Sequence, residues 1–442
     1  MERQSGLGVG TGTALCIGAV LGPGALTLTS AAAAAAGPGS IVAWLGLVVV
    51  SLPIAWVFAA LSARHPDGGG VAAFTSRAFG PFLAAPVGWW FYWAVPLGVP
   101  AAALIGGQYA AAAAGWGQTA ASVVALLVLA AAYGSNLVGL RLSGRIQLLM
   151  VGLLAALLAV TITVSGTHVQ PTHFAPFLPH GWNSVGIAAG ILFFAFAGWE
   201  AVSHLAAEFS TPSRDLPRAT LLAWGIVSVL YLGLAYVTIG VLGPRAANTT
   251  TPLTLLLEQD FGAPARAVAA TAALLLTFGA VNAYLAGASR LGEALGRQGA
   301  MPRGITTQFT GAGVPRRSLT VVTLVSVLIT MGAALGLIGL DGLLRATSAC
   351  LAAVTLAGLA SATVLLRGRT LLRISAAASC GVVGTVLVFC GPFLLVPTVL
   401  AAAAIGFRAI STAASSTGDA GTDSTAARRD VVAGDRAEDL TV

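Results

Sequence analysis

Gly18-Ala19-Val20-Leu21-Gly22-Pro23-Gly24 interrupts the first long apolar run of the chain, residues 9–36. Relative to alanine in a helix interior, glycine costs about 1 kcal/mol and proline about 3 kcal/mol. A helix broken at membrane depth leaves unpaired backbone groups, which are tolerated only inside protein or beside a cavity. The stretch therefore predicts two half-helices whose partly charged ends suit a small zwitterion or anion. The alternative is an intact helix with Gly18 and Gly22 as a packing face.

The composition indicates a membrane protein with many spans. Of the 442 residues, 57% are hydrophobic and 8% are charged, and the mean hydropathy is +0.89. All 22 basic residues are arginine, and we interpret the net charge of +7 as topology information, not as a nucleic-acid footprint. The four cysteines lack metal-ligand spacing and are predicted to be small buried hydrophobes: Cys16, Cys350, Cys380 and Cys390.

A length of about 20 residues per membrane span divides the chain into twelve predicted helices. The first run is too long for the apolar core of a signal peptide. Pro217 is expected to open the seventh helix, because proline suits a first helical position. The predicted spans are 9–36, 40–62, 82–113, 119–138, 146–165, 184–206, 219–242, 263–289, 318–338, 342–366, 372–389 and 391–408.

The arginines are distributed unevenly between the loops on the two sides of these spans. Loops on the side of the N-terminus hold most of them, whereas the opposite loops hold only Arg245, Arg266 and, at a span end, Arg345. By the positive-inside rule, both termini are expected in the cytoplasm of a multi-pass plasma-membrane protein. The N-terminal side carries Arg64, Arg77, Arg141, Arg145, Arg214, Arg218, Arg290, Arg297, Arg303, Arg316, Arg317, Arg367, Arg369 and Arg373.

The sixth predicted span contains a second irregular stretch, Phe193-Phe194-Ala195-Phe196-Ala197-Gly198-Trp199-Glu200. A glycine and a carboxylate lie well inside this apolar run. Glu200, His204 and Glu208 follow at four-residue intervals and would share one helix face. Ionisable groups inside a membrane are costly and are functional candidates by default. Glu200 and His204 are therefore candidates for proton coupling; the alternative is that His204 and Glu208 lie at the cytoplasmic boundary.

Interruptions in spans 1 and 6 predict a transporter built from an inverted repeat of five plus five helices, the LeuT-like fold. The expected units are a cytoplasmic N-terminus (1–8), a first repeat (9–165), an outer loop (166–183), a second repeat (184–366), two further helices (367–408) and a disordered cytoplasmic tail (409–442). Because five is odd, the second repeat would enter the membrane from the opposite side. The fold class is therefore an all-α polytopic membrane protein.

Several motifs also resemble those of a known family. They are the Gly22-Pro23-Gly24 break, Gly68-Gly69-Gly70-Val71, Pro96-Leu97-Gly98-Val99-Pro100-Ala101-Ala102, Phe196-Ala197-Gly198-Trp199-Glu200-Ala201, Glu208-Phe209 and Pro212-Ser213-Arg214-Asp215-Leu216-Pro217-Arg218-Ala219. In this order, across spans 1 to 10, they resemble the amino acid–polyamine–organocation superfamily of permeases. The subgroup that they resemble most is the bacterial exporters of methionine and branched-chain amino acids.

The resemblance implies a binding site made from both interruptions. The backbone around Gly22, Pro23 and Gly24 would receive the substrate carboxylate, and carbonyls near Phe194, Ala197 and Gly198 would receive its ammonium group. Phe194 matches an aromatic gate, Glu200 matches a carboxylate implicated in proton-linked movement, and Val99 and Asn282 match pocket-lining positions. Some proton-coupled relatives have a lysine in span 5, which this chain lacks. The pocket would be mostly apolar, lined also by Val20, Leu21 and Phe193.

These features predict a secondary transporter of small neutral amino acids (methionine, leucine, isoleucine, valine) that works by alternating access, with proton-coupled efflux. An importer or exchanger of the same superfamily is the alternative, and a channel or membrane enzyme would be a different class. A membrane enzyme would need more polar groups inside the membrane than this chain has. The GxxxxGK(S/T) loop of ATPases is ruled out because the chain has no lysine. We expect no cofactor, no metal and no nucleic-acid partner; the interacting species are the amino acid, protons and the lipid bilayer, and the oligomeric state is left open.

His168, His173 and His180 lie close together in the expected outer loop. Three histidines raise the possibility of a metal site. Their spacing is irregular and prolines separate them, so an ordered outer loop is the better interpretation.

Overall fold

The structure is a computed structural model, and it describes residues 8–65, 70–139, 144–200, 209, 211–302, 304 and 315–411. His204 and Glu208 lie outside the described residues, as does most of the predicted tail. The last described helix continues to Ser411, so the first residues of the predicted tail still belong to it.

Helices make up most of the described chain, because a backbone inside a bilayer must satisfy its own hydrogen bonds. The α-helices are α1 (Val9–Val20), α2 (Leu28–Ala36), α3 (Ser40–Arg64), α4 (Gly70–Phe79), α5 (Pro81–Ala114), α6 (Gln118–Leu137), α7 (Gly144–Ser165), α8 (Gly181–Phe196), α10 (Pro212–Leu242), α11 (Pro252–Phe261), α12 (Pro264–Arg297), α14 (Arg316–Ala334), α15 (Leu340–Leu365), α16 (Thr370–Phe389) and a final helix over 395–411. Short 3-10 segments connect them: η1 (Pro23–Leu26), η2 (Gly37–Gly39), η3 (Gly166–His168), η4 (Pro171–Phe174), η6 (Gly243–Asn248) and η7 (Gly391–Leu394).

Ten helices within the described ranges are long and apolar enough to cross a membrane. They coincide with predicted spans 2–5 and 7–12. Among the described residues, the predicted spans 1 and 6 contain the shorter apolar helices Val9–Val20 and Gly181–Phe196. α2, in the last part of predicted span 1, belongs to the first of the ten long segments, Leu28–Arg64. The protein is thus a multi-pass, all-helical membrane protein, and the count of twelve spans stays a prediction.

Two short helices lie in the connections between the spans. Dividing the chain into spans of about 20 residues did not predict them. α4 and α11 have ten residues each and each bury one apolar face. The seventh helix also begins earlier than predicted, at Pro212, so Pro217 lies inside α10 and the prediction that it opens this helix is wrong. Pro212 takes the first helical position instead, and Thr211 hydrogen-bonds the Asp215 carboxylate in the first turn.

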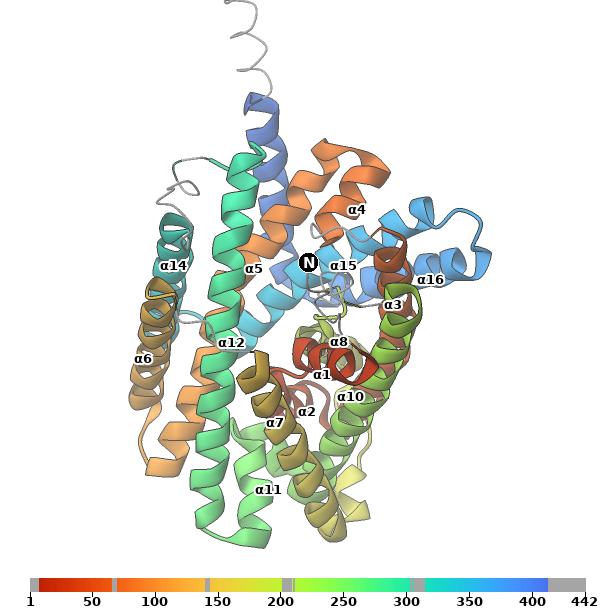
Figure 1. Ribbon diagram of the computed structural model, residues 1–442. Coiled ribbons are helices and arrows are strands. Elements are labelled where there is room, and N and C mark those ends of the chain that lie inside the picture. Colours follow the sequence, from red (N-terminus) through yellow and green to blue (C-terminus); the bar gives the residue numbers. More distant parts are fainter. Residues whose placement is uncertain are drawn as a thin grey trace, which may run out of the picture.

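The interrupted helices lie in the interior of the bundle. α1 packs against α10 and α7, and α2 packs against α8. Figure 1 shows these segments between the long pair α5 and α12 on one side and α3 and α10 on the other. Irregular backbone is therefore enclosed by protein, which is the condition for tolerating it at membrane depth.

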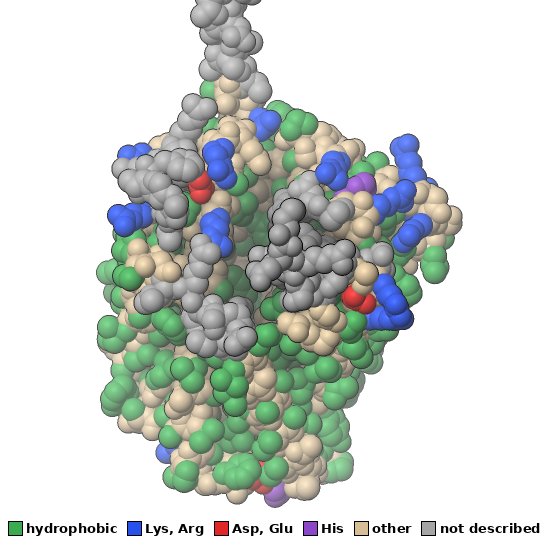
Figure 2. All heavy atoms as spheres, in the orientation of Figure 1, with side chains coloured by type: hydrophobic (Ala, Val, Ile, Leu, Met, Phe, Trp, Pro, Cys, Tyr) green, Lys and Arg blue, Asp and Glu red, His purple; other side chains and the backbone are tan. Residues whose placement is uncertain are grey.

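The molecular surface separates into an apolar body and an arginine-rich end. Large hydrophobic side chains such as Leu127 (62% exposed) and Val229 (69% exposed) face outward, as expected for contact with lipid. Figure 2 shows the arginines gathered over the upper part of the molecule, above this hydrophobic surface. Exposed arginines that belong to the predicted N-terminal side include Arg64, Arg77, Arg290, Arg297, Arg316, Arg367 and Arg369.

Candidate binding site at two interrupted helices

The first interruption separates α1 from α2. α1 ends at Val20, Leu21 leaves the helical conformation (φ −80°, ψ 86°) and Gly22 is extended (φ −111°, ψ −170°). Pro23 then opens the 3-10 turn η1. The predicted break is confirmed, and the alternative of an intact helix with a glycine packing face is wrong. Pro23 has no N–H, and the N–H of Ala25 donates to the carbonyl of Gly22 at 3.1 Å. Within η1, the N–H of Gly24 is therefore the group that lacks an acceptor among the described residues, and it is available to an anionic group.

The second interruption follows α8, which ends at Phe196. Ala197 is extended (φ −70°, ψ 125°), and Gly198 has a φ of +145°, a conformation rarely open to residues with a Cβ. The predicted break at Gly198 is confirmed. The continuation of this span lies outside the described residues, so the structure does not place His204.

The two interruptions touch each other through backbone. A Cβ on Gly198 would lie 2.4 Å from the carbonyl oxygen of Ala19 and 3.2 Å from the Cα of Val20. Only glycine allows this approach, because any side chain at residue 198 would overlap the end of α1. Segments nearly 180 residues apart in the sequence thus form one irregular region inside the bundle.

Tyr231 of α10 joins the carbonyl ends of both half-helices. Its hydroxyl lies 2.9 Å from the carbonyl oxygen of Val20 and 3.4 Å from that of Ala195. The Val20 carbonyl also accepts from the N–H of Gly22 at 3.0 Å, whereas the structure shows no other donor to the Ala195 carbonyl among the described residues. The hydroxyl therefore provides a donor that the interruption of α8 removed. The rings of Trp44 and Phe196 pack around Tyr231 at centroid distances of 5.1 and 5.6 Å.

We expect Tyr231→Phe to lower the free energy of unfolding by about 1–3 kcal/mol, because it leaves the buried carbonyl of Ala195 without a donor among the described residues. Thermal unfolding of the purified protein in detergent measures this effect. Tyr236→Phe is the matched control on the same helix, since Tyr236 is half exposed and stacks on Phe174 through its ring. Equal melting temperatures for wild type and Tyr231→Phe would contradict the role assigned to this hydroxyl.

Phe194 lies over the first interruption. Its ring carbons are within 3.0–3.3 Å of the position that a Cβ on Gly24 would occupy, and 3.7 Å from the corresponding position on Gly98 of α5. Thr347 of α15 contacts the same position on Gly98. The ring therefore lies between η1, α5 and α15, and the glycines provide the room for it.

The other apolar candidates are buried in the core. Val20, Leu21 and Phe193 are at most 3% exposed. Val99, next to Gly98 on α5, is fully buried. Asn282 of α12 is also buried, but its carboxamide oxygen accepts a hydrogen bond of 2.7 Å from Asn136 of α6. Among the described residues, no recorded hydrogen bond or ring contact joins Asn282 to either interruption, whereas Gly24, Phe194, Val20 and Gly198 are brought together.

Glu200 is 3% exposed, four residues beyond the end of α8. Its Oε2 atom accepts a hydrogen bond of 3.1 Å from the backbone N–H of Gly198. The carboxylate therefore stabilises the extended backbone of the second interruption. Glu200 would keep this structural role even if it took no part in proton coupling.

Sequence reasoning missed several residues that build this region. Tyr109 of α5 donates to the carbonyl of Leu26 at 2.6 Å and accepts from the N–H of Leu253 at 3.3 Å. The hydroxyls of Thr29 and Ser30 and the indole N–H of Trp199 are buried, and within the described chain they have no hydrogen-bond partner. The available signal was three hydroxyl residues shortly after the first break, Thr27, Thr29 and Ser30.

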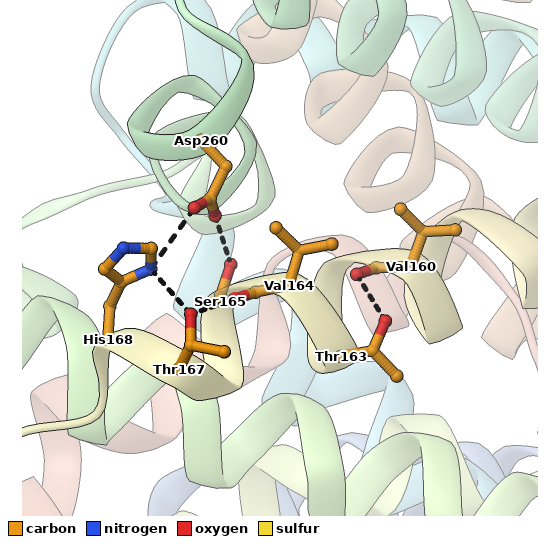
Figure 3. A network of polar contacts seen from close by, with 7 residues as sticks. All are labelled: Val160, Thr163, Val164, Ser165, Thr167, His168 and Asp260. Atoms are coloured by element: carbon orange, nitrogen blue, oxygen red, sulfur yellow. Dashed lines mark hydrogen bonds and ion pairs between the residues drawn. The ribbon is translucent and has the colours of Figure 1, made fainter.

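The histidines of the outer connection have separate contacts. His168 lies 3.2 Å from Asp260 of α11, and Ser165 donates to the same carboxylate at 3.3 Å. Figure 3 shows both side chains directed at Asp260. His173 contacts the carbonyl of Gly240 at 2.8 Å, and His180 precedes α8. No group of three metal-binding side chains occurs among the residues that the structure describes.

The sequence was compared with protein families and with known proteins. A family model described as "Amino acid permease" matches residues 7–418. The uncharacterized amino acid permease YecA of Bacillus subtilis is 35% identical over 398 residues, which cover 89% of this chain and 92% of that relative.

Two further relatives have names that state a substrate. The L-methionine/branched-chain amino acid exporter YjeH of Escherichia coli is 32% identical over 289 residues, covering 64% of this chain and 68% of the relative. The branched-chain amino acid permease BcaP of Bacillus subtilis is 27% identical over 266 residues, covering 56% and 57%.

Proposed function

The chain belongs to the amino acid permease family, and from this premise we propose that it is a secondary transporter of methionine, leucine, isoleucine and valine. The family makes it a transporter and not an enzyme. The substrate class is our inference from the lining of the two interruptions and from the names of two relatives.

The observation that carries the proposal is the direct contact between the two interrupted helices. Gly198 packs on the backbone of Ala19 and Val20, so the N–H of Gly24 after one break and the carbonyl end of α8 at the other belong to one enclosed region. Helix N-termini attract anions and helix C-termini attract cations. A zwitterionic amino acid presents both charges, and broken helices at the midplane are the usual site in inverted-repeat transporters.

The side-chain preference follows from the apolar candidate residues. Val20, Leu21, Phe193 and Val99 are apolar and buried, with Phe194 above Gly24. A charged substrate side chain would be costly there without a partner, whereas an aliphatic or thioether side chain gains from burial. Thr29, Ser30 and Trp199 offer polar atoms for the α-carboxylate or α-ammonium group.

We propose that the transporter exports its substrates in exchange for protons by alternating access. The name of the E. coli relative supports the direction. Glu200 is the coupling candidate, because a carboxylate buried in one state and hydrated in the other would bind a proton with different affinity in the two states. His204 on the next turn of the predicted helix is the second candidate.

We also propose twelve spans in a five-plus-five inverted repeat, with both termini in the cytoplasm, on the basis of the one-sided arginines. In a variant without native cysteines, an impermeant thiol reagent added to intact cells is expected to label Thr172→Cys but not Thr370→Cys. Both positions are exposed, and Thr370 lies at the arginine-rich end. Labelling of Thr370→Cys from outside would overturn this orientation.

A flux assay in proteoliposomes tests the proposed function. Vesicles loaded with labelled methionine or leucine should release the label faster than protein-free vesicles when unlabelled methionine is added outside, and an imposed pH gradient should change the rate. If none of the four amino acids moves in either direction, the proposed substrate class is wrong.

A further inference from the structure

A cavity of about 640 Å³ lies at the arginine-rich end of the bundle, away from the interrupted helices. One face of α3 forms its wall, with Trp56, Ala60, Ala63 and Arg64. Residues 56, 60, 63 and 64 follow helical spacing, so they lie along one side of α3. Pro217 of α10 and the turn between α15 and α16 close the other sides.

Three arginines line this cavity, Arg64, Arg367 and Arg369. Arg367 and Arg369 flank Gly368, which has a φ of +88° and lets the chain reverse between α15 and α16. Arg64 donates to the carbonyl of Arg367 at 3.4 Å, which ties the end of α3 to this turn. All three side chains are exposed, and none of the ion pairs between described residues includes them.

The imidazole of His65 lies close to positive charge. The pKa of the His65 imidazole, which directly follows α3, lies below its ordinary value. Partial burial is the main cause, and the nearby Arg77 and Arg64 add to it. Three guanidinium groups around one cavity suit a phosphate, because arginine matches the geometry of phosphate oxygens.

The side of the cavity away from the arginines is lined by the apolar residues Trp56 and Ala60, which lie farther along α3 toward the membrane-spanning part. Trp56 is 55% exposed and lies eight residues before Arg64, which corresponds to about 12 Å along the helix axis. A soluble anion needs only the arginines, whereas a lipid also places an acyl chain along an apolar groove. Tryptophan at the membrane interface is a common contact for lipid near the headgroup.

We propose that this cavity binds one anionic phospholipid. The phosphate would lie between Arg64, Arg367 and Arg369, and an acyl chain would lie along Trp56 and Ala60. The bound lipid would join α3, α10 and the α15–α16 turn. The inference uses only the location of the chain in a membrane and is independent of the transported substrate.

Native mass spectrometry of delipidated protein titrated with phosphatidylglycerol or phosphatidylcholine tests the proposal. We expect wild type to bind one phosphatidylglycerol at least tenfold more tightly than phosphatidylcholine. Arg367→Gln/Arg369→Gln should weaken the binding of phosphatidylglycerol by about 30-fold. Arg290→Gln/Arg316→Gln, which removes two exposed arginines outside the cavity at the same end, should leave the binding unchanged.

A second variant separates loss of the site from loss of the fold. Ala63→Phe fills the cavity and keeps all three arginines, so it should also abolish the preference for phosphatidylglycerol, while the melting temperature in detergent stays that of wild type. Equal weakening by the two double variants would show attraction by surface charge in general and overturn the proposal. If millimolar inorganic phosphate displaced all the bound lipid, the proposal would also be overturned, and the arginines would form a site for a free anion.

Discussion

Gly198→Ala is expected to abolish transport and to lower the free energy of unfolding by roughly 2–6 kcal/mol. A non-glycine residue at φ +145° is strained, and its Cβ would lie 2.4 Å from the backbone oxygen of Ala19. That oxygen belongs to backbone at the end of α1, which cannot rotate away as a flexible side chain can. Expression level, melting temperature in detergent and flux of labelled methionine should therefore fall together.

Two other glycines serve as controls. Gly225 of α10 has nothing within 4 Å of an added Cβ, so Gly225→Ala should keep both the melting temperature and the flux. Gly22 also has open space at its Cβ position and has an ordinary φ of −111°. Gly22→Ala should therefore keep the melting temperature but reduce the flux, because its methyl group would project into the space assigned to the substrate. Wild-type flux and stability in Gly198→Ala would contradict the proposed contact between the interruptions.

Glu200→Gln is expected to abolish accumulation driven by a pH gradient while exchange of labelled methionine continues. Glutamine keeps an oxygen that can accept from the N–H of Gly198, so the local backbone is preserved. It cannot bind or release a proton, so the two conformations would no longer differ in proton affinity at this residue. Uptake in proteoliposomes with and without a pH gradient measures accumulation, and counterflow at equal pH measures exchange.

Two further variants separate coupling from structure. Glu200→Ala removes the acceptor for Gly198 and should lower stability by about 1–3 kcal/mol in addition to the loss of coupling. Glu293→Gln is the matched control, since Glu293 pairs with Arg297 near the end of α12, away from the interruptions. If Glu200→Gln accumulates methionine like wild type, Glu200 has only its structural contact and another group carries the proton.

The interruptions were predictable because glycine and proline act through their own backbone. Gly22-Pro23-Gly24 cannot continue a helix, and a glycine followed by a carboxylate in an apolar span marks Gly198. Those local preferences are confirmed by the ends of α1 and α8. The long spans were predictable for a similar reason, since their length and hydropathy are properties of single segments.

The partners of the interruptions depend on tertiary packing and were not predictable in this way. Tyr231 and Tyr109 lie in apolar runs, where a tyrosine resembles any other core residue until the structure shows which carbonyl its hydroxyl meets. Asn282 was placed in the pocket by resemblance, whereas its recorded partner is Asn136 of α6. The helices α4 and α11 are too short for a rule based on membrane thickness.

The central claim is that the two interruptions bind the α-carboxylate and α-ammonium groups of a neutral amino acid, and competition in the counterflow assay tests it most directly. Unlabelled methionine, its decarboxylated amine and its amide would each be added in tenfold excess over labelled methionine. We expect methionine to compete fully and the other two to leave the flux almost unchanged, because the N–H of Gly24 at the start of η1 would lack its anionic partner. Competition by the amine or the amide equal to that of methionine would contradict the account.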